Sequence, residues 1–259
     1  MSPGLSLWWI PRAFLECDIL GQLEDKYLIP AERNDTLSDP MRRATRVALR
    51  TILSVTRGES WGSERFATTS DGRPFIDRAM APVFSVSHTL TAGLVAVADD
   101  GPLGVDIERM RATKLGQSRI QSIIRAATHH GIWDGASSTS ESSCLELEVE
   151  GEVEADRMFL VVWTRLEAIA KARGGGIGAL LEDIGARPGA EHLIHVGPRV
   201  RPLNSVLPSG CSMRPLALPS GHVGAVVARM GPSPPPLRWF PTSLTALDEF
   251  CQSGLGRCE

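Results

Sequence analysis

The sequence lacks the features that mark a nucleic-acid binder or a membrane protein. Its 259 residues include 27 Lys and Arg against 30 Asp and Glu, which gives a formal net charge of -3. A nucleic-acid binder would carry a basic excess, so this balance argues against that class. No apolar run approaches the length that spans a bilayer, and the short run Leu7–Ile10 has no basic flank for a signal peptide. We therefore expect a cytoplasmic protein that binds neither nucleic acid nor membranes.

Cysteine is also scarce, and its spacing fits neither a disulfide framework nor a zinc site. The five cysteines are Cys17, Cys144, Cys211, Cys251 and Cys258. Their number is odd and no pair has the CxxC spacing typical of metal ligands, which argues against both kinds of site. With 42% hydrophobic residues, the chain can bury one large core or two small ones.

A strand pattern with paired carboxylates is the strongest local signal. In the run Gly104–Glu108, two aliphatic residues alternate with Asp106 and Glu108. On a strand, this alternation places both carboxylates on one face and buries the aliphatic pair. Neighbouring carboxylates repel each other and persist most easily around a cation. A small number of hard oxygen ligands suits Mg²⁺, which shares its shell with water and substrate phosphates. The pattern therefore predicts a Mg²⁺-phosphate site.

A second run predicts an amphipathic helix that carries a third carboxylate. Its apolar stripe has helical spacing and consists of Trp163, Leu166, Ile169 and Ala170. Glu167 and Lys171 lie one turn apart on another face. The simpler interpretation is an exposed ion pair of little energetic value. The functional interpretation is a carboxylate and a cation that face a ligand together.

Ser87 and His88 follow a predicted strand over 84–86, which a short turn joins to a second predicted strand over 94–97. Histidine serves many roles, so a lone His is a weak signal by itself. Both side chains can donate hydrogen bonds to phosphate oxygens. The hairpin also leads into the Asp106 strand, so both residues are candidates for a phosphate site.

Arginines in two places are candidate anion contacts. A helix is predicted from Asp39 onward, because Asp followed by Pro is a favourable helix start. Its polar flank consists of Arg42, Arg43, Arg46 and Arg50. Such a flank is usually a solvated face. Arg73 lies in the predicted turn Asp71–Pro74, where the alternative is an exposed turn arginine.

The two runs, in this order and preceded by Phe84–His88, resemble the signature of the 4'-phosphopantetheinyl transferases. The first half reads Gly-Val-Asp-Ile-Glu at Gly104–Glu108, and the second reads Trp-Thr-x-x-Glu-Ala-x-x-Lys at Trp163–Lys171. The resemblance runs roughly from Met41 to Arg229 and points to the larger, monomeric, surfactin-synthetase-activating type. It implies a holo-[acyl-carrier-protein] synthase type of enzyme. Such an enzyme transfers 4'-phosphopantetheine from coenzyme A to a serine of an apo acyl or peptidyl carrier protein and releases adenosine 3',5'-bisphosphate.

The resemblance also implies roles for the candidate residues. Mg²⁺ would be held by Asp106, Glu108 and Glu167. Coenzyme A would be contacted by Arg42 or Arg43 at the 3'-phosphate, and by Arg73, Ser87, His88 and Lys171 near the pyrophosphate. Catalysis would involve Glu167, Lys171 and His88, with Glu167 taking the serine proton directly or through water. Two departures stand out: Arg73 replaces a lysine of the family's Gly-Lys-Pro turn, and Leu166 replaces a lysine tied to a secondary phosphate or carrier contact.

The fold that the resemblance implies is α+β, with two similar lobes in a pseudo-twofold arrangement and the active site between them. We expect an N-terminal lobe over 1–106, a C-terminal lobe over 107–230 and a Pro-rich extension over 231–259. The stretch 135–156 is rich in Ser, Thr and Glu and poor in large apolar residues, which predicts a mobile insertion or loop over most of it. Strands are expected over 193–196 and 223–227, and a helix over 115–127.

Two other functions are consistent with the same residues. An inactive relative could bind coenzyme A or a carrier protein without turnover, although Asp106, Glu108, Glu167 and Lys171 are all present. An unrelated Mg²⁺-dependent phosphohydrolase could use three carboxylates and a lysine in the same way. The carrier could belong to fatty-acid, polyketide or nonribosomal-peptide biosynthesis, because no local sequence signature identifies it.

Overall fold

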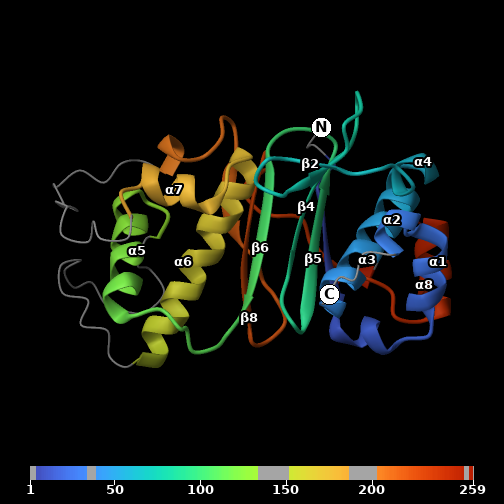
Figure 1. Ribbon diagram of the computed structural model, residues 1–259, viewed down its shortest axis with the longest axis horizontal. Coiled ribbons are helices and arrows are strands. Elements are labelled where there is room, and N and C mark those ends of the chain that lie inside the picture. The colour runs from blue at the N-terminus through green and yellow to red at the C-terminus, as the bar shows by residue number, and fades with distance from the viewer. Residues whose placement is uncertain (1–3, 34–38, 134–151, 187–202, 254–256, 259) are drawn as a thin grey trace.

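The computed structural model describes residues 4–33, 39–133, 152–186, 203–253 and 257–258. The fold is mixed α+β: two larger sheets stand in the middle of the molecule, and helices cover them at both ends (Figure 1). Within these ranges, no helix is long and apolar enough to cross a bilayer. The predicted α+β class is therefore correct, while the pseudo-twofold relation between two lobes stays a prediction.

The larger sheet has five strands in the order β10-β9-β1-β5-β4. These strands are β1 Ser6–Pro11, β4 Val83–His88, β5 Ala92–Ala98, β9 Leu237–Trp239 and β10 Arg257–Cys258. β5 is antiparallel to β1 and β4, whereas β9 runs parallel to β1. All residues of β5 are buried, as a continuous apolar run indicates for a strand covered on both faces.

The second sheet has three antiparallel strands in the order β6-β8-β7. They are β6 Leu103–Arg109, β7 Ser212–Pro215 and β8 His222–Ala228. A separate hairpin pairs β2 Ala67–Thr68 with β3 Pro74–Phe75. The turn of this hairpin contains Gly72 at φ 85°, a left-handed conformation that glycine adopts without steric cost.

Helices cover the outer face of each sheet. Those beside the five-stranded sheet are the 3-10 helix η1 Arg12–Glu16, α1 Ile19–Tyr27, α2 Pro30–Arg33, α3 Pro40–Arg57, α4 Glu59–Gly62 and α8 Leu244–Ser253. Those beside the three-stranded sheet are α5 Gln117–His129, α6 Glu152–Arg173, α7 Ile177–Asp183 and η2 Leu203–Ser205. α6 begins within the stretch 135–156 that was predicted as a loop, which corrects the end of that stretch. The rest of it up to 151, and the strand expected over 193–196, lie outside the described residues.

The start of α3 follows from its sequence. Asp39 is the N-cap, and its Oδ1 accepts hydrogen bonds from the backbone nitrogens of Met41 at 2.8 Å and Arg42 at 3.3 Å. Pro40 is the first helical residue, where its missing N–H costs nothing. The apolar face of the helix packs on the five-stranded sheet, which leaves the arginine flank on other faces.

The other long helix, α6, lies against β6 at very short range. A Cβ atom at Gly104 would collide with the carbonyl oxygen of Ala168 and the backbone nitrogen of Ala172. Any larger residue would push the helix away from the strand. Gly104, the glycine of the strand signature, therefore sets the distance between β6 and the helix that carries Glu167 and Lys171.

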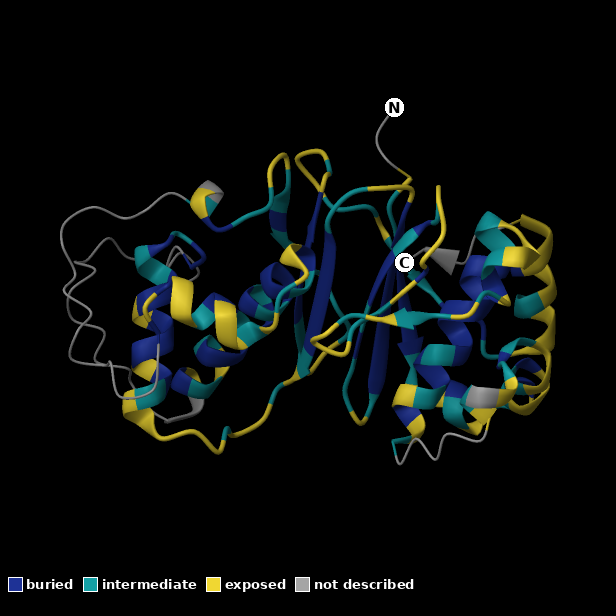
Figure 2. Cartoon of the chain, turned by 45° about the horizontal axis from the view of Figure 1, so that its top comes forward, coloured by how far each residue is buried: buried dark blue, intermediate teal, exposed yellow. Residues whose placement is uncertain are grey.

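Among the described residues, three clusters of buried apolar side chains hold the layers together. Figure 2 shows the strands in the middle and the inner sides of the helices as buried. One lies between α3 and the five-stranded sheet, one lies among α5, α6 and the three-stranded sheet, and the third lies between the two sheets. The third contains Trp9 of β1, Leu94 of β5, and Val105 and Ile107 of β6. The aliphatic pair of the strand signature is thus buried between the sheets, as its alternation predicts.

The segment after Gly231 was predicted from its prolines as an extension. In the structure, β9 and α8 of this segment belong to the compact fold. β9 pairs with β1, so that Leu237 lies opposite Leu7. Farther on, Phe250 of α8 is 1% exposed, and its ring centroid lies 5.0 Å from that of Trp8. This segment therefore completes the sheet and the core beside the first strand.

Candidate functional site

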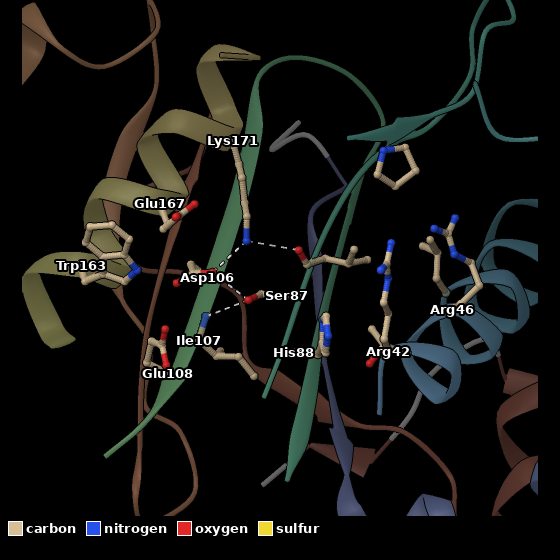
Figure 3. Close-up of a pocket in the computed structure, with 14 residues that line it drawn as sticks. Arg42, Arg46, Ser87, His88, Asp106, Ile107, Glu108, Trp163, Glu167 and Lys171 are labelled. Atoms are coloured by element: carbon tan, nitrogen blue, oxygen red, sulfur yellow. Dashed lines mark hydrogen bonds and ion pairs between the residues drawn. The ribbon is translucent and has the colours of Figure 1, made fainter. Parts of the chain in front are cut away.

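A cavity of about 360 Å³ opens where α3 and β4 face β6 and α6. It is lined by Arg42, Thr45, Arg46, Leu49, Pro74, Val86, Ser87, His88, Asp106, Ile107, Glu108, Trp163, Glu167 and Lys171. Figure 3 shows the carboxylates on the β6 and α6 side and the arginines on the α3 side. Seven of the nine candidate residues from the sequence line this cavity; Arg43 and Arg73 do not.

Asp106 is the most buried carboxylate of the site, with 6% of its surface exposed. Its Oδ1 accepts hydrogen bonds from Ser87 Oγ at 2.7 Å and from Lys171 Nζ at 2.8 Å. A buried carboxylate persists only when it is paired and hydrogen-bonded. Ser87 and Lys171 meet that need here, and they come from β4 and α6 respectively.

Glu108 and Glu167 complete a group of three carboxylates around the cavity. Burial raises the pKa of Glu167, and the nearby Asp106 carboxylate raises it further. Burial also raises the pKa of Glu108, although Arg111, which lies 3.2 Å from it, opposes this effect. Each group therefore holds its proton more tightly than an ordinary glutamate, chiefly because burial disfavours the charged form.

The chemistry of this donor set fits a hard divalent cation, because three carboxylates supply oxygen ligands and mutual repulsion that a cation would relieve. In the stretches that the structure describes, however, no three His, Cys, Asp or Glu side chains come together closely enough to form a metal site as they stand. Lys171 Nζ is instead the cation bound to Asp106. The residues can supply the ligands, but their side chains would have to move together to do so.

Lys171 spans the space between the two sheets. Besides Asp106, its Nζ donates to the carbonyl oxygens of Val105 at 3.0 Å and Val86 at 3.4 Å. The ammonium therefore has three oxygen partners in the structure, from β4 and β6. The interpretation of Lys171 and Glu167 as nothing more than an exposed ion pair is wrong, because Lys171 pairs with Asp106.

His88 lies at the opposite wall of the cavity, at the end of β4. Its Nε2 is 3.3 Å from Oδ2 of Asp39, the residue that caps α3. Burial lowers the pKa of His88, and the Asp39 carboxylate opposes the shift. The imidazole is therefore mainly neutral at neutral pH and offers a hydrogen bond more than a charge.

The structure separates Arg42 from Arg43. Arg42 lines the cavity, whereas Arg43 forms a bidentate ion pair with Glu24 of α1, with Nε to Oε1 at 2.7 Å and Nη2 to Oε2 at 3.1 Å. Arg46, one helical turn after Arg42 on the predicted polar flank, also lines the cavity, although only Arg42 and Arg43 were predicted to contact coenzyme A. Its spacing of four residues from Arg42 is the signal that could have identified it.

Arg73 does not line this cavity but lines a second one of about 380 Å³, which Glu167 and Lys171 also line. Its guanidinium donates to the backbone carbonyls of Leu103 at 2.8 Å, Phe84 at 3.3 Å and Lys171. Burial lowers the pKa of Arg73. Leu166, where the resemblance expects a lysine, has no exposed surface and packs in the core around α6, so this position cannot contact a ligand.

Comparison with known proteins agrees with the chemistry of the cavity. No model of a protein family matches the chain. Two curated proteins are similar, both named 4'-phosphopantetheinyl transferase AcpT, from Salmonella typhimurium and Salmonella typhi. Each is 26% identical over 170 residues, which cover 66% of this chain and 76% of the relative. This weak similarity supports the 4'-phosphopantetheinyl transferase superfamily and, with it, a transferase.

Proposed function

We propose that the chain transfers the 4'-phosphopantetheine group of coenzyme A to a serine hydroxyl of an apo acyl or peptidyl carrier protein. The products are the holo carrier and adenosine 3',5'-bisphosphate. The observation that carries the proposal is the cavity itself, which places Arg42, Ser87 and His88 opposite Asp106 and Glu167. A pyrophosphate needs both anion donors and a charge-neutralising metal, and the two walls offer these separately.

The carboxylates Asp106, Glu108 and Glu167 would hold Mg²⁺, which when bound neutralises charge on the pyrophosphate. Ion pairing of Lys171 with one of these carboxylates keeps its ammonium at the place where phosphate oxygens would come. Lys171, Ser87 and His88 would then donate hydrogen bonds to those oxygens as charge grows in the transition state. Arg42 would bind the 3'-phosphate at the far end of the same cavity.

The chemical step is a displacement at phosphorus. The serine oxygen forms a bond to the phosphorus next to pantetheine, and the bond from that phosphorus to the bridging oxygen breaks, so the electron pair leaves with adenosine 3',5'-bisphosphate. Glu167 would take the serine proton, directly or through a water molecule. Burial raises its pKa in the metal-free protein, which is the direction that favours a general base.

Several finer features belong to the same proposal. They are the surfactin-synthetase-activating type, two lobes over 1–106 and 107–230 with the site between them, a monomeric state and a cytoplasmic location. The charge-separated walls from α3 with β4 and from β6 with α6 support a site between two parts. The pairing of β9 with β1 argues for assigning the extension to the N-terminal part.

The test is incubation of the protein with coenzyme A, Mg²⁺ and a panel of apo carrier proteins, with intact-mass measurement of each carrier. We expect the mass of at least one carrier to increase by one phosphopantetheine group, and the same carrier with its acceptor serine changed to alanine to stay unmodified. Loss of coenzyme A without a modified carrier would indicate a phosphohydrolase. Binding of coenzyme A with no chemical change would indicate an inactive relative.

A further inference from the structure

The two sheets meet along β4 and β6, each of which is an edge strand of its own sheet. The two strands lie side by side in the middle of the molecule (Figure 1). Edge strands carry backbone N–H and C=O groups that need partners once they are buried. Side chains supply these partners, and we call this set of contacts the seam.

Two serines of β4 accept hydrogen bonds from backbone amides of β6. Oγ of Ser85 accepts a hydrogen bond from the backbone nitrogen of Val105 at 3.1 Å, and Oγ of Ser87 accepts one from Ile107 at 3.3 Å. The amides on both sides of Asp106 are therefore held by hydroxyl groups of the opposite sheet. Ser85 is only 3% exposed, so a lost partner could not be replaced easily by water.

Two cations fill the carbonyl positions of the seam. Arg73 donates to Phe84 of β4 and Leu103 of β6, and to the carbonyl of Lys171 in α6. Lys171 donates to the carbonyl of Val86 in β4 and to that of Val105 in β6, two residues after the carbonyls that Arg73 binds in each strand. The side chains that join the two sheets therefore follow one another along the seam in the order Arg73, Ser85, Lys171 and Ser87.

The donors of Arg73 are committed to backbone groups from three elements, α6, β4 and β6. A planar guanidinium can serve three carbonyls at once because its N–H groups point in fixed, diverging directions. A lysine at this position would carry its three donors on a single nitrogen at the end of a flexible stem and would not match the diverging directions of the guanidinium.

We propose that Arg73 and Ser85 are positioning residues that fix β6, and with it Asp106, against β4, and that neither contacts the phosphates of coenzyme A. The importance of Asp106 rests on the proposed function, whereas the seam rests on geometry alone. This role differs from the phosphate contact that the resemblance implies for Arg73. It also explains why arginine in place of the family's lysine is a substantive difference here.

The test measures two quantities for each variant. One is the rate of amide hydrogen exchange by NMR in the metal-free full chain. The other is the Mg²⁺ concentration that half-saturates coenzyme A binding. We expect Arg73→Lys to speed exchange of the Val105 and Ile107 amides roughly tenfold and to raise the half-saturating Mg²⁺ concentration several-fold, because one charged donor partner is worth about that factor. If Arg73 acted only through its charge on phosphate, lysine would keep both values unchanged, and that result would overturn its part of the proposal.

Ser85 is tested with an isosteric pair. Ser85→Thr keeps the hydroxyl acceptor, so the Val105 amide should exchange at the rate of the unaltered protein. Ser85→Val has the shape of threonine but lacks the acceptor, so the same amide should exchange roughly tenfold faster. Equal behaviour of the two variants would refute the role of Ser85. Ser122→Ala, which removes a hydroxyl equally buried at 3% exposure in α5, should change neither measurement.

Amides of β5 serve as the internal reference, because this strand lies in the same core but is hydrogen-bonded on both sides by backbone ladders. Acceleration shared equally by β5 would mean general destabilisation and would overturn the proposal. The exchange experiment also stands apart from catalysis. If the unaltered protein modified no carrier, the proposed function would fail, and exchange would still decide whether the seam exists.

Discussion

Arginine and histidine side chains reach the cavity from α3 and β4, whereas carboxylates reach it from β6 and α6. The walls are otherwise built alike. A Cβ on Gly93 of β5 would collide with Thr45 of α3, and a Cβ on Gly104 of β6 would collide with the backbone of α6. On each side a long helix therefore packs closely on a strand; the arginines come from α3, whereas the carboxylates come from β6 and α6. The comparison teaches that the same close packing of helix on strand can present basic side chains on one side of a cavity and acidic side chains on the other.

The largest expected effect comes from removing a charge from the acidic wall. Asp106→Asn keeps the shape and one acceptor oxygen but loses a metal ligand charge, so carrier modification should fall by about 10²-fold or more. Steady-state transfer rates over a range of Mg²⁺ concentrations provide the measurement. Asp99→Asn, which alters an exposed carboxylate paired with Arg57, is the matched control. Near-normal turnover of Asp106→Asn at limiting Mg²⁺ would remove the acidic wall from the mechanism.

Lys171 stands between the walls, and its loss should come next in size. Lys171→Met removes the donor to Asp106 and should lower the transfer rate by roughly 10²-fold, as expected for one transition-state donor. Because Lys171 also lowers the pKa of Glu108 and Glu167, both values should rise further in the variant. Transfer rates and carboxylate titration by NMR test the two parts. The control is Arg173→Met, which lies on the same helix as Lys171 and removes a surface ion pair with Asp183 of α7. It should change neither the transfer rate nor the carboxylate pKa values.

The basic wall offers a matched pair of neighbouring arginines. Arg42→Ala should weaken binding of coenzyme A by roughly tenfold or more while leaving its 3'-dephospho form nearly unaffected, because a charged phosphate contact is lost. Arg43→Ala removes the ion pair with Glu24 and should alter stability more than affinity. Calorimetric titration with both ligands distinguishes the two. An equal loss of affinity for both ligands in Arg42→Ala would show that Arg42 does not bind the 3'-phosphate.

The smallest effect concerns the stability of the metal-free protein. Since the pKa of Glu167 is raised above its ordinary 4.5, the folded state binds this proton more tightly than the unfolded state. The free energy of unfolding therefore falls as the pH rises from 4.5 through the raised pKa. Glu167→Gln should remove part of that fall, by less than about 1 kcal/mol for a partly exposed group. Urea unfolding across this pH range measures it, and an equal change in Glu154→Gln, on the same helix, would contradict the assignment.

The parts of the site that depend on local pattern could be predicted from the sequence. Alternation in Gly104–Glu108 indicated a strand with a buried aliphatic pair, and helical spacing indicated the helix of Glu167 and Lys171. The pair Asp39 and Pro40 marked the start of α3 at the residue where it begins. Each of these signals acts within a few residues of the chain, where backbone geometry alone decides the outcome.

The partners of individual side chains could not be predicted, because they depend on contacts between distant segments. Arg42 and Arg43 are neighbours in one helix, and only the position of Glu24 in α1 decides which of them turns away from the cavity. The carbonyl partners of Arg73 come from three separate elements. β9 has three residues, too few to show an alternating pattern, so its place in the sheet was missed.

The late return of the chain to its first strand has a consequence for synthesis on the ribosome. β1 and the ring of Trp8 are made early, yet β9 and Phe250, which pair with them, are made only after the strands β4, β5, β6 and β8. Contacts so far apart in sequence form slowly, because a long loop must close before any of them is gained. The core around β1 is therefore completed late, and a nascent chain stalled before residue 237 would leave the rings of Trp8 and Phe14 without their partners Phe250 and Phe240.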